Sequence, residues 1–286
     1  MSEPEARTCL DCSKPFHTAW AQRLCNPCRY ERASRGTCAG YGRKTGQSGR
    51  TVCGECRYGP TPPILPMTAT DIAWLAGIIE GEGTFGRKGH PAGQVRVQMT
   101  DEDVIDRLHS LTGVGAVHSR GKPAEHCRPV WEWSVIRRGN VLALHQLIAP
   151  LLLSRRRATV CSRLAAASLD MPTVAPPNPA TPESWAWVAG LIEGEGWIGP
   201  APASVRRAPV IGVESTDDDV IERLAVLTGV GTVIPIKSRN PGVWKTASRW
   251  TVRRRSDVRD VLNAILPLLG ERRSARARYV LDAVTS

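Results

Sequence analysis

The sequence contains no apolar run that approaches the roughly 20 residues needed to cross a bilayer. Its first ten residues, MSEPEARTCL, lack the charged and then apolar layout of a secretory signal peptide. No intein splicing residues are evident, and lysine is scarce beside arginine. The lack of a long apolar run and of a signal peptide argues against a membrane-spanning or secreted protein, and the lack of intein residues favours a free-standing or intron-borne gene. The first two absences predict a location inside the cell, in the cytoplasm or on the nucleoid.

What is abundant is positive charge. The chain has 286 residues, enough for about two domains, and its formal net charge is +11. A hydrophobic content of 42% can supply a real core. Soluble proteins this basic usually bind a polyanion, most often nucleic acid. The alternative reading is a merely soluble surface with an arginine-rich bias.

Cysteine is concentrated at one end, because seven of the nine cysteines lie within residues 1–60. In a reducing compartment, clustered cysteines indicate a metal site rather than disulfides. Four of them, Cys9, Cys12, Cys25 and Cys28, have nearly the spacing of a four-thiolate Zn²⁺ ribbon. Three more, Cys38, Cys53 and Cys56, could hold a second Zn²⁺ only with an outside ligand or water, and His17 is a weak candidate.

Arginines stand beside these thiolates in CNPCRYERASRG. That composition favours an accessory DNA-binding finger. A folding staple or a protein-contact module would use the same metal site, so both remain alternatives.

The rest of the chain divides into two copies of one unit. We place the first subdomain at residues 67–170 and the second at 185–286, with a proline-rich linker at 171–184. WLAGIIEGEG (74–83) returns as WVAGLIEGEG (187–196), and TDEDVIDRLHSLTGVGAV (100–117) returns as TDDDVIERLAVLTGVGTV (216–233). Such ordered similarity indicates an internal duplication.

Each copy predicts the element order αββαββα, an α+β unit with helices on one face of a sheet. The repeated phrase has helical length and ends at Gly83 or Gly196. In the first copy we expect a strand at VRVQM (95–99), a helix over 101–111, strands at GAVHSR and WEWSVIR, and a helix over about 141–153. The uncovered face of the sheet is a candidate DNA-contacting surface.

Small residues form a stripe on each repeated helix. Ala73, Gly77 and Gly81 fall four apart, as do their counterparts Ala186, Gly190 and Gly194. Residues four apart share one side of a helix, and small side chains allow another backbone to approach closely. The stripe could instead pack against the helix's own sheet. Its presence in both copies favours the two helices packing against each other.

This packing would bring acidic residues together at the helix C-termini. Glu80 and Glu82 would meet Glu193 and Glu195 there. A helix C-terminus is already partly negative, and clustered carboxylates need a positive partner. Oxygen ligands of this kind suit Mg²⁺, so we predict a divalent-metal site at the contact.

The doubled phrase resembles the LAGLIDADG signature of homing endonucleases, in the single-chain form with two motifs. The resemblance covers about residues 71–286. It implies two pseudo-symmetric subdomains that form a DNA-binding saddle, with metal ligands at Glu82 and Glu195 and backbone carbonyls from Gly81 and Gly194. A helical wheel instead turns Glu80 and Glu193 nearer the stripe. Here we follow the resemblance, since a Gly-Glu-Gly ending can unwind.

The same resemblance implies polar or basic side chains near each metal, at strand ends. By position these are Gln98 and Glu214, then Arg137 and Arg254. Glu214 fits the pattern less well than Gln98, because a further carboxylate changes the charge balance. The two arginines could equally be plain phosphate contacts.

Sequence recognition would come from side chains on the open sheet faces. Candidate DNA contacts are Arg96, Arg120, Arg239, Arg249 and Arg253. Because the two copies differ, the double-stranded DNA target should be asymmetric. One chain carries both halves, so we expect a monomer.

The sequence thus predicts a site-specific, Mg²⁺-dependent endonuclease of a mobile genetic element. Two alternatives use the same fold: a non-cleaving DNA-binding regulator and an RNA maturase.

Overall fold

The computed structural model describes residues 5–8, 15–18, 62–86, 93–200, 209–236 and 246–285. The chain divides into two compact units, residues 1–62 and residues 63–286. In the first unit, β1 (Glu5–Thr8) pairs antiparallel with β2 (Pro15–Thr18). All seven clustered cysteines lie outside the described residues, so the zinc predictions stay predictions.

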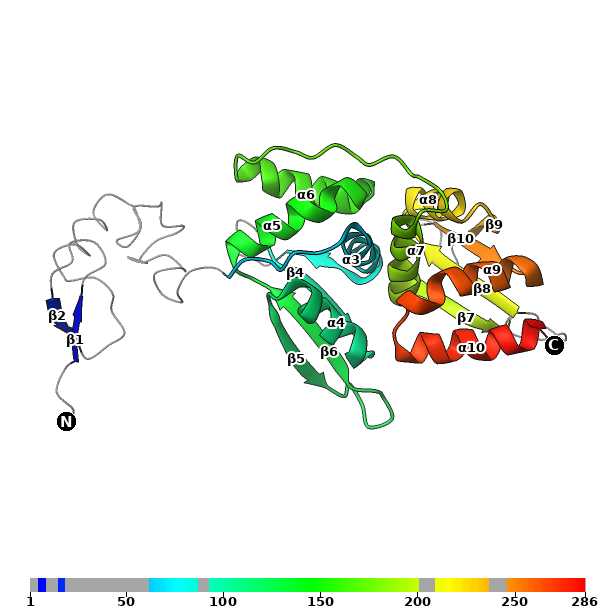
Figure 1. Cartoon of the computed structure of the whole chain (residues 1–286), viewed down its shortest axis with the longest axis horizontal. Helices are drawn as coiled ribbons and strands as arrows, with labels where there is room; N and C mark the ends of the chain where they lie inside the picture. The colour runs from blue at the N-terminus through cyan, green and yellow to red at the C-terminus, as the bar shows by residue number, and fades with distance from the viewer. Residues whose placement is uncertain are drawn as a thin grey trace. The chain divides into compact units, whose positions relative to one another are not determined.

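The second unit contains two halves with the same order of elements (Figure 1). The first half comprises α3 (Ala69–Glu82), β3 (Thr84–Phe85), β4 (Val95–Met99), α4 (Glu102–Thr112), β5 (Ala116–Gly121), β6 (Val130–Val135), α5 (Arg138–Ile148) and α6 (Ser154–Ala166). The second comprises α7 (Pro182–Glu195), β7 (Gly196–Pro200), β8 (Pro209–Ser215), α8 (Asp218–Thr228), β9 (Thr232–Ile236), β10 (Ala247–Val252), α9 (Arg255–Ile265) and α10 (Glu271–Thr285).

Each half has one four-stranded antiparallel sheet. The strand orders are β3-β4-β6-β5 and β7-β8-β10-β9, which correspond position by position. The predicted α+β class is therefore confirmed for the described part of this unit. None of its described helices is long and apolar enough to cross a membrane.

Local chemistry explains where the two repeated helices begin. Thr68 caps α3: its hydroxyl accepts a hydrogen bond from the Asp71 backbone N–H, and the Asp71 carboxylate accepts one from the Thr68 backbone N–H. Thr181 caps α7, and Pro182 occupies the first turn, where a missing N–H costs nothing. Both helices end at the glutamate before the final glycine of the phrase.

One predicted helix is wrong. The segment 141–153 does not form a single helix, because α5 ends at Ile148 and a 3₁₀ turn (Ala149–Leu151) precedes α6. A second 3₁₀ turn (Leu266–Leu268) separates α9 from α10 in the same way. Pro150 and Pro267 explain the break, since proline cannot donate the next helical hydrogen bond. Each half therefore reads αββαββαα.

Alternation along the strands separates a covered face from an open one. On β4, Val95 and Val97 are fully buried, whereas Arg96 and Gln98 are partly exposed. Trp133 and Trp250 occupy equivalent places in the two cores and have no exposed surface. Each donates its indole N–H to a backbone carbonyl that lies two residues after a helix. Trp133 donates to Val114, after α4, and Trp250 donates to Val230, after α8. The polar residues of β4 thus project from the face away from the core.

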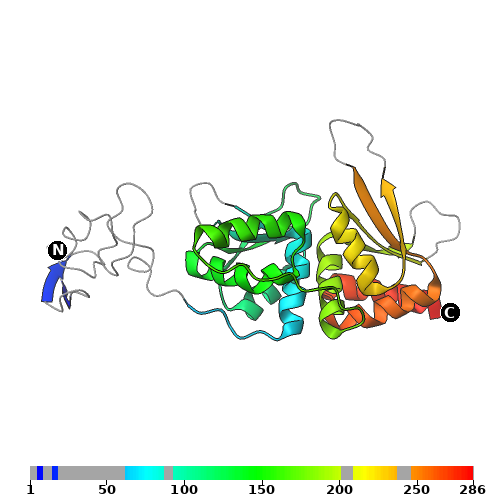
Figure 2. The same ribbon diagram turned by 90° about the horizontal axis from the view of Figure 1, so that it is seen from above.

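The two halves meet through α3 and α7, which lie side by side between the sheets (Figures 1 and 2). Reciprocal bonds flank this helix pair. Arg272 on α10 forms a two-pronged ion pair with Asp101 of the first half, at 2.6 Å for each bond. Arg155 on α6 pairs with Asp217 of the second half at 2.5 Å. The last helix of each half is therefore tied to the opposite half.

Candidate functional site

Glycines let α3 and α7 touch backbone to backbone. A Cβ atom added to Gly77 would lie 2.2 Å from the Trp187 carbonyl oxygen. One added to Gly190 would lie 2.3 Å from the Trp74 carbonyl oxygen. Neither distance is tolerable for carbon and oxygen that are not bonded. The two small-residue stripes therefore face each other, as the repeated spacing predicts.

The contact continues to the C-terminal ends of both helices. A Cβ on Gly81 would lie 3.3 Å from the Gly194 Cα and 3.2 Å from the Glu195 Cγ. A Cβ on Gly194 would lie 3.2 Å from both the Gly81 Cα and the Glu82 Cγ. Each glutamate thus crosses the contact and packs on the glycine of the other half. Glu82 and Glu195 share one small region.

The first acid of each phrase lies elsewhere. Glu80, 4% exposed, accepts a hydrogen bond from the Leu153 N–H at 2.9 Å. Glu193, 1% exposed, accepts one from the Gly270 N–H at 2.6 Å. Both donors stand immediately before the last helix of the same half, so these acids bind helix N-termini. The helical-wheel expectation that they turn toward the stripe is wrong.

Burial perturbs these first acids strongly. Desolvation raises the pKa of Glu80 to about 7, against the opposing effects of the Leu153 hydrogen bond and the Arg156 charge. Burial likewise raises the pKa of Glu193, and the Arg273 charge opposes it. With backbone donors already committed to them, their role is to anchor helices.

Two arginines complete the helix ends. Arg156 on α6 donates to the carbonyl oxygens of Glu80 (3.1 Å), Gly81 (2.8 Å) and Gly83. Arg273 on α10 donates twice to the carbonyl of Glu193, at 2.9 and 3.2 Å, and once to that of Gly196. They satisfy carbonyl groups that a helix end leaves without partners.

The role of both arginines at the helix ends was not predicted from the sequence, although a signal was present. They stand at equivalent places in the copies, in PLLLSRRRA (150–158) and PLLGERRSA (267–275). Aligning the two copies would have singled them out.

Glu82 and Glu195 lack such partners. Neither carboxylate accepts a hydrogen bond or an ion pair from any residue that the structure describes. Partial burial raises the pKa of both groups, and the Glu195 charge raises that of Glu82 further. Arg156 and Arg273 oppose the shift from a distance. Two unpartnered carboxylates that destabilise each other form a place where a cation is favourable.

The donor set fits a hard divalent cation that keeps several waters. No group of three or more His, Cys, Asp or Glu side chains converges among the described residues. The protein would therefore supply only the carboxylates of Glu82 and Glu195 and, as the resemblance implies, carbonyls of Gly81 and Gly194. Mg²⁺ is commonly bound in this way, by one or two carboxylates plus substrate phosphates.

Three other predicted site residues share a cavity with Glu195. Glu195, Glu214, Arg249 and Arg253 line one cavity of about 480 Å³, together with Trp197. Glu214 accepts a hydrogen bond from the Arg249 Nε at 2.6 Å. The extra negative charge that made Glu214 fit less well is therefore balanced by its neighbour.

The first half carries a cross-strand pair at the same two positions, but a neutral glutamine and an acid replace the acid and the arginine. Gln98 stands at the Glu214 position and donates to Glu132, which stands at the Arg249 position. Arg120 binds both oxygens of Glu132, and Arg96 lies 3.9 Å from it. Glu132 is thus a fixed acceptor that orients two predicted DNA-contacting arginines on the open sheet face.

Arg137 and Arg254 precede the helices that follow the last strands. They are the N-cap residues of α5 and α9. The Arg254 side chain is 81% exposed and lies 4.0 Å from Asp257, so it is free to move toward a ligand. Arg239 lies outside the described residues. The structure therefore leaves the proposed roles of these arginines as predictions.

A further asymmetry was not foreseen. Trp197 stands where the first half has Thr84, and Gly212 stands where it has Arg96. A Cβ on Gly212 would lie 2.2 Å from the Trp197 ring, so the indole lies flat on this glycine. An aromatic ring thus replaces a guanidinium group on the open face of the second sheet.

The fold matches solved structures of DNA-bound enzymes. The I-AabMI LAGLIDADG meganuclease bound to uncleaved DNA superposes with a TM-score of 0.51 at 17% identity, covering 75% of this chain and 91% of that one. The I-LtrWI LAGLIDADG homing endonuclease bound to target DNA gives 0.50 at 15% identity, covering 76% and 92%. The chain has the LAGLIDADG fold. No protein-family model matches the sequence. The search of curated proteins likewise found no match.

Proposed function

We propose that this chain is a site-specific, divalent-metal-dependent DNA endonuclease that makes a double-strand break in a long, asymmetric target. The observation that carries the proposal is the pair Glu82 and Glu195. They are held together by a backbone contact, lack a partner among the described residues, and belong to a basic chain with the LAGLIDADG fold.

The division of acids within each phrase supports this assignment. Glu80 and Glu193 are occupied with backbone donors, so they are unavailable as metal ligands. Glu82 and Glu195 remain, and the resemblance assigns the ligands to these same positions. A divalent cation bound there would polarise the scissile phosphodiester and lower the pKa of a bound water.

The chain's own residues would do the rest. The glutamates hold opposing positions across α3 and α7, one for each DNA strand. Arg156 and Arg273 fix the ends of these helices, which keeps the carboxylates from drifting apart. Different side chains on the two open faces, such as Arg96 and Trp197, would read different half-sites.

The test is cleavage of a supercoiled plasmid library in Mg²⁺. Wild-type protein should give discrete double-strand breaks. Glu82→Gln and Glu195→Gln should each abolish double-strand cutting while retaining DNA affinity, because neither change adds bulk. Glu102→Gln, at an exposed carboxylate on α4, is the matched control and should cut normally. Binding without any cutting by wild-type protein would indicate a regulator and refute the proposal.

The cysteine head is proposed to bind Zn²⁺ through Cys9, Cys12, Cys25 and Cys28. Metal analysis of the purified chain should find one bound zinc that a Cys9→Ser, Cys28→Ser variant loses. A zinc content unchanged in that variant would refute this ligand set.

A further inference from the structure

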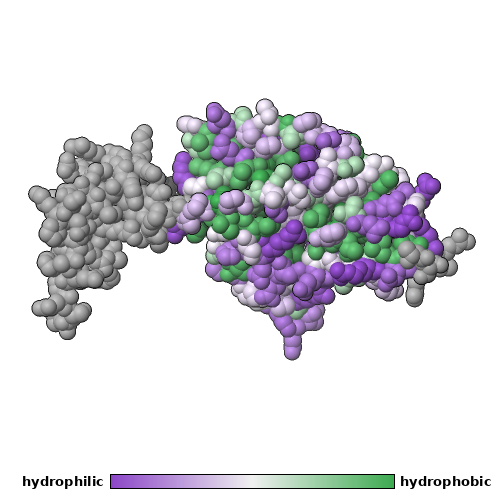
Figure 3. Space-filling view, in the orientation of Figure 1, coloured by the Kyte–Doolittle hydropathy of each residue, from purple (hydrophilic) through white to green (hydrophobic). Residues whose placement is uncertain are grey.

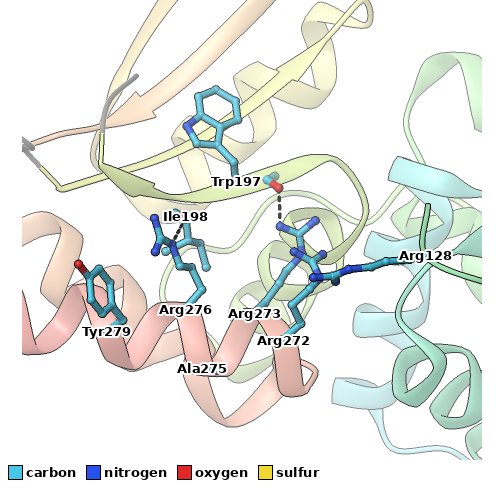
Figure 4. Close-up of a pocket in the computed structure, with 9 residues that line it drawn as sticks. Arg128, Trp197, Ile198, Arg272, Arg273, Ala275, Arg276 and Tyr279 are labelled. Atoms are coloured by element: carbon cyan, nitrogen blue, oxygen red, sulfur yellow. Dashed lines mark hydrogen bonds between the residues drawn. The ribbon is translucent and has the colours of Figure 1, made fainter. Parts of the chain in front are cut away.

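A second cavity lies between α10 and the edge strand β7, which begins at the residue after Glu195. Its volume is about 610 Å³, and its lining includes Arg128, Trp197, Arg272, Arg273, Arg276 and Tyr279 (Figure 4). Arg128 comes from the first half, just before β6, and the others come from the second half. Figure 4 shows the side chains of Arg128 and Arg272 extending from different elements toward the same region, while Arg273 donates to the Gly196 carbonyl.

The positive charge of this cavity exceeds what the protein neutralises. Arg272 is paired with Asp101, and Arg273 lies 3.2 Å from Glu193. Arg128 is exposed and forms no hydrogen bond or ion pair within the described part of the chain. Four guanidinium groups therefore face two carboxylates, which favours an anionic ligand.

The Arg276 guanidinium group is held in an orientation that suits an anionic ligand. Its Nε donates to the Ile198 carbonyl at 3.0 Å, and its two outer nitrogens have no hydrogen bond to any residue that the structure describes. A Cβ on Gly199 would lie 2.8 Å from one of these nitrogens, so the guanidinium group rests on a glycine. The Arg276 Cζ lies 5.1 Å from the centroid of the Tyr279 ring. Held by these three contacts, Arg276 keeps a fixed fork of donors for phosphate oxygens.

The cavity shares one lining residue with the cavity that contains Glu195. Trp197 lines both this cavity and the one that contains Glu195. Gly196 and Ile198, which also line it, follow Glu195 directly in the chain. Hydrophilic side chains gather over α10 on the outer surface as well (Figure 3). A DNA strand positioned at Glu195 would therefore reach the arginines through its next phosphates.

We propose that this arginine pocket binds a backbone phosphate of duplex DNA beside the cut site, on the second half only. The first half keeps Arg155 and Arg156 at the positions of Arg272 and Arg273, but Thr159 and Ser162 stand where α10 has Arg276 and Tyr279. The pocket thus anchors the DNA on one side. The identification of DNA as the partner rests on the proposed function. The group that the pocket would bind is a phosphodiester.

The experiment measures affinity for a mixed-sequence duplex without divalent metal, as a function of salt. Arg128→Gln and Arg276→Gln should each weaken binding and reduce the slope of log K against log salt by about 1, the effect of one lost phosphate contact. Arg276→Lys should keep the slope and lose only affinity, because the charge remains. Arg278→Gln is the matched control: it is exposed on the same helix but outside the pocket, and it should keep both values closer to wild type.

The outcomes separate this proposal from the proposed function. Slopes for Arg128→Gln and Arg276→Gln equal to that of Arg278→Gln would overturn the pocket, whether or not the protein cuts DNA. Reduced slopes in a protein that never cuts would support the pocket and refute the endonuclease. Binding of inorganic phosphate or pyrophosphate that these variants lose, with unchanged DNA slopes, would indicate a free-anion site and overturn the backbone assignment. Failure of the wild type to bind the duplex would overturn both.

Discussion

Replacing Gly77 with alanine tests the helix contact on which the site depends. The new Cβ would lie 2.2 Å from the Trp187 carbonyl oxygen and 2.9 Å from the Leu191 nitrogen. These atoms belong to backbone, so no side chain can rotate away. The helices must separate by about 1 Å, since contacts of this kind need roughly 3.4 Å or more.

The expected cost follows from two opposing effects. Overpacking a core costs about 1–3 kcal/mol, and more where backbone must move. Alanine in place of a helical glycine returns about 0.5–1 kcal/mol. We expect Gly77→Ala to lower the free energy of unfolding by about 2 kcal/mol or more. In a unit of this size that corresponds to a fall in Tm of about 4–8 °C.

Gly81→Ala provides the matched comparison on the same helix. Its Cβ would lie 3.2–3.4 Å from the nearest atoms, one of which is the flexible Glu195 Cγ. Stability should change little, whereas double-strand cutting should fall because Glu195 is displaced. Thermal and urea unfolding measure the first effect, and plasmid cleavage measures the second. Equal stabilities for Gly77→Ala and wild type would refute the backbone contact.

Three further changes test other parts of the unit. His145 is fully buried, neither ring nitrogen has a partner in the described part of the chain, and burial lowers its pKa to about 4. Stability should therefore fall by about 1.4 kcal/mol per pH unit from pH 6.5 down to 4, and His145→Leu should remove that slope in acid unfolding curves. A double-mutant cycle between Asp101 and Arg272, read by urea unfolding, should give a coupling of about 1 kcal/mol, since Arg272 is partly exposed. Gly212→Ala should destabilise by about 1–3 kcal/mol in thermal unfolding, and Trp197→Ala in the same chain should recover most of the loss.

The duplicated pattern allowed much of the fold to be predicted. Alternation in VRVQM gave β4, and the spacing of apolar residues after Thr100 gave α4, because both signals are local. The small-residue stripe was decisive only because it occurs twice. One such stripe is compatible with packing on a sheet, whereas two in one chain suggested the partner. The contact between the two repeated helices could therefore be predicted from the sequence.

The side of the helix on which each glutamate lies could not be predicted from the sequence in the same way. Which glutamate faces α7 depends on how the helix ends at Gly83 and on donors far along the chain, at Leu153 and Arg156. A helical wheel takes account of neither the helix end nor these distant donors, so it places Glu80 on the wrong side of the helix. For the same reason α6 was not predicted. The apolar periodicity suggested one helix over 141–153, whereas Pro150 separates α5 from α6. Sequence periodicity describes a helix interior well and its ends poorly.

The helix ends also distinguish the two halves. Arg156 donates to the Gly81 carbonyl, whereas Arg273 sends its bonds to Glu193 and Gly196 and none to Gly194. The Gly81 carbonyl therefore shares its lone pairs, and the two carbonyls that the resemblance implies as ligands differ in donor strength. We expect one DNA strand to be cut faster, visible as nicked plasmid before linear product. Arg156→Lys, which lacks the planar fork of three donor nitrogens, should change the ratio of the two nicking rates. Equal rates for both strands in wild type and variant would show that this difference has no effect on the chemistry.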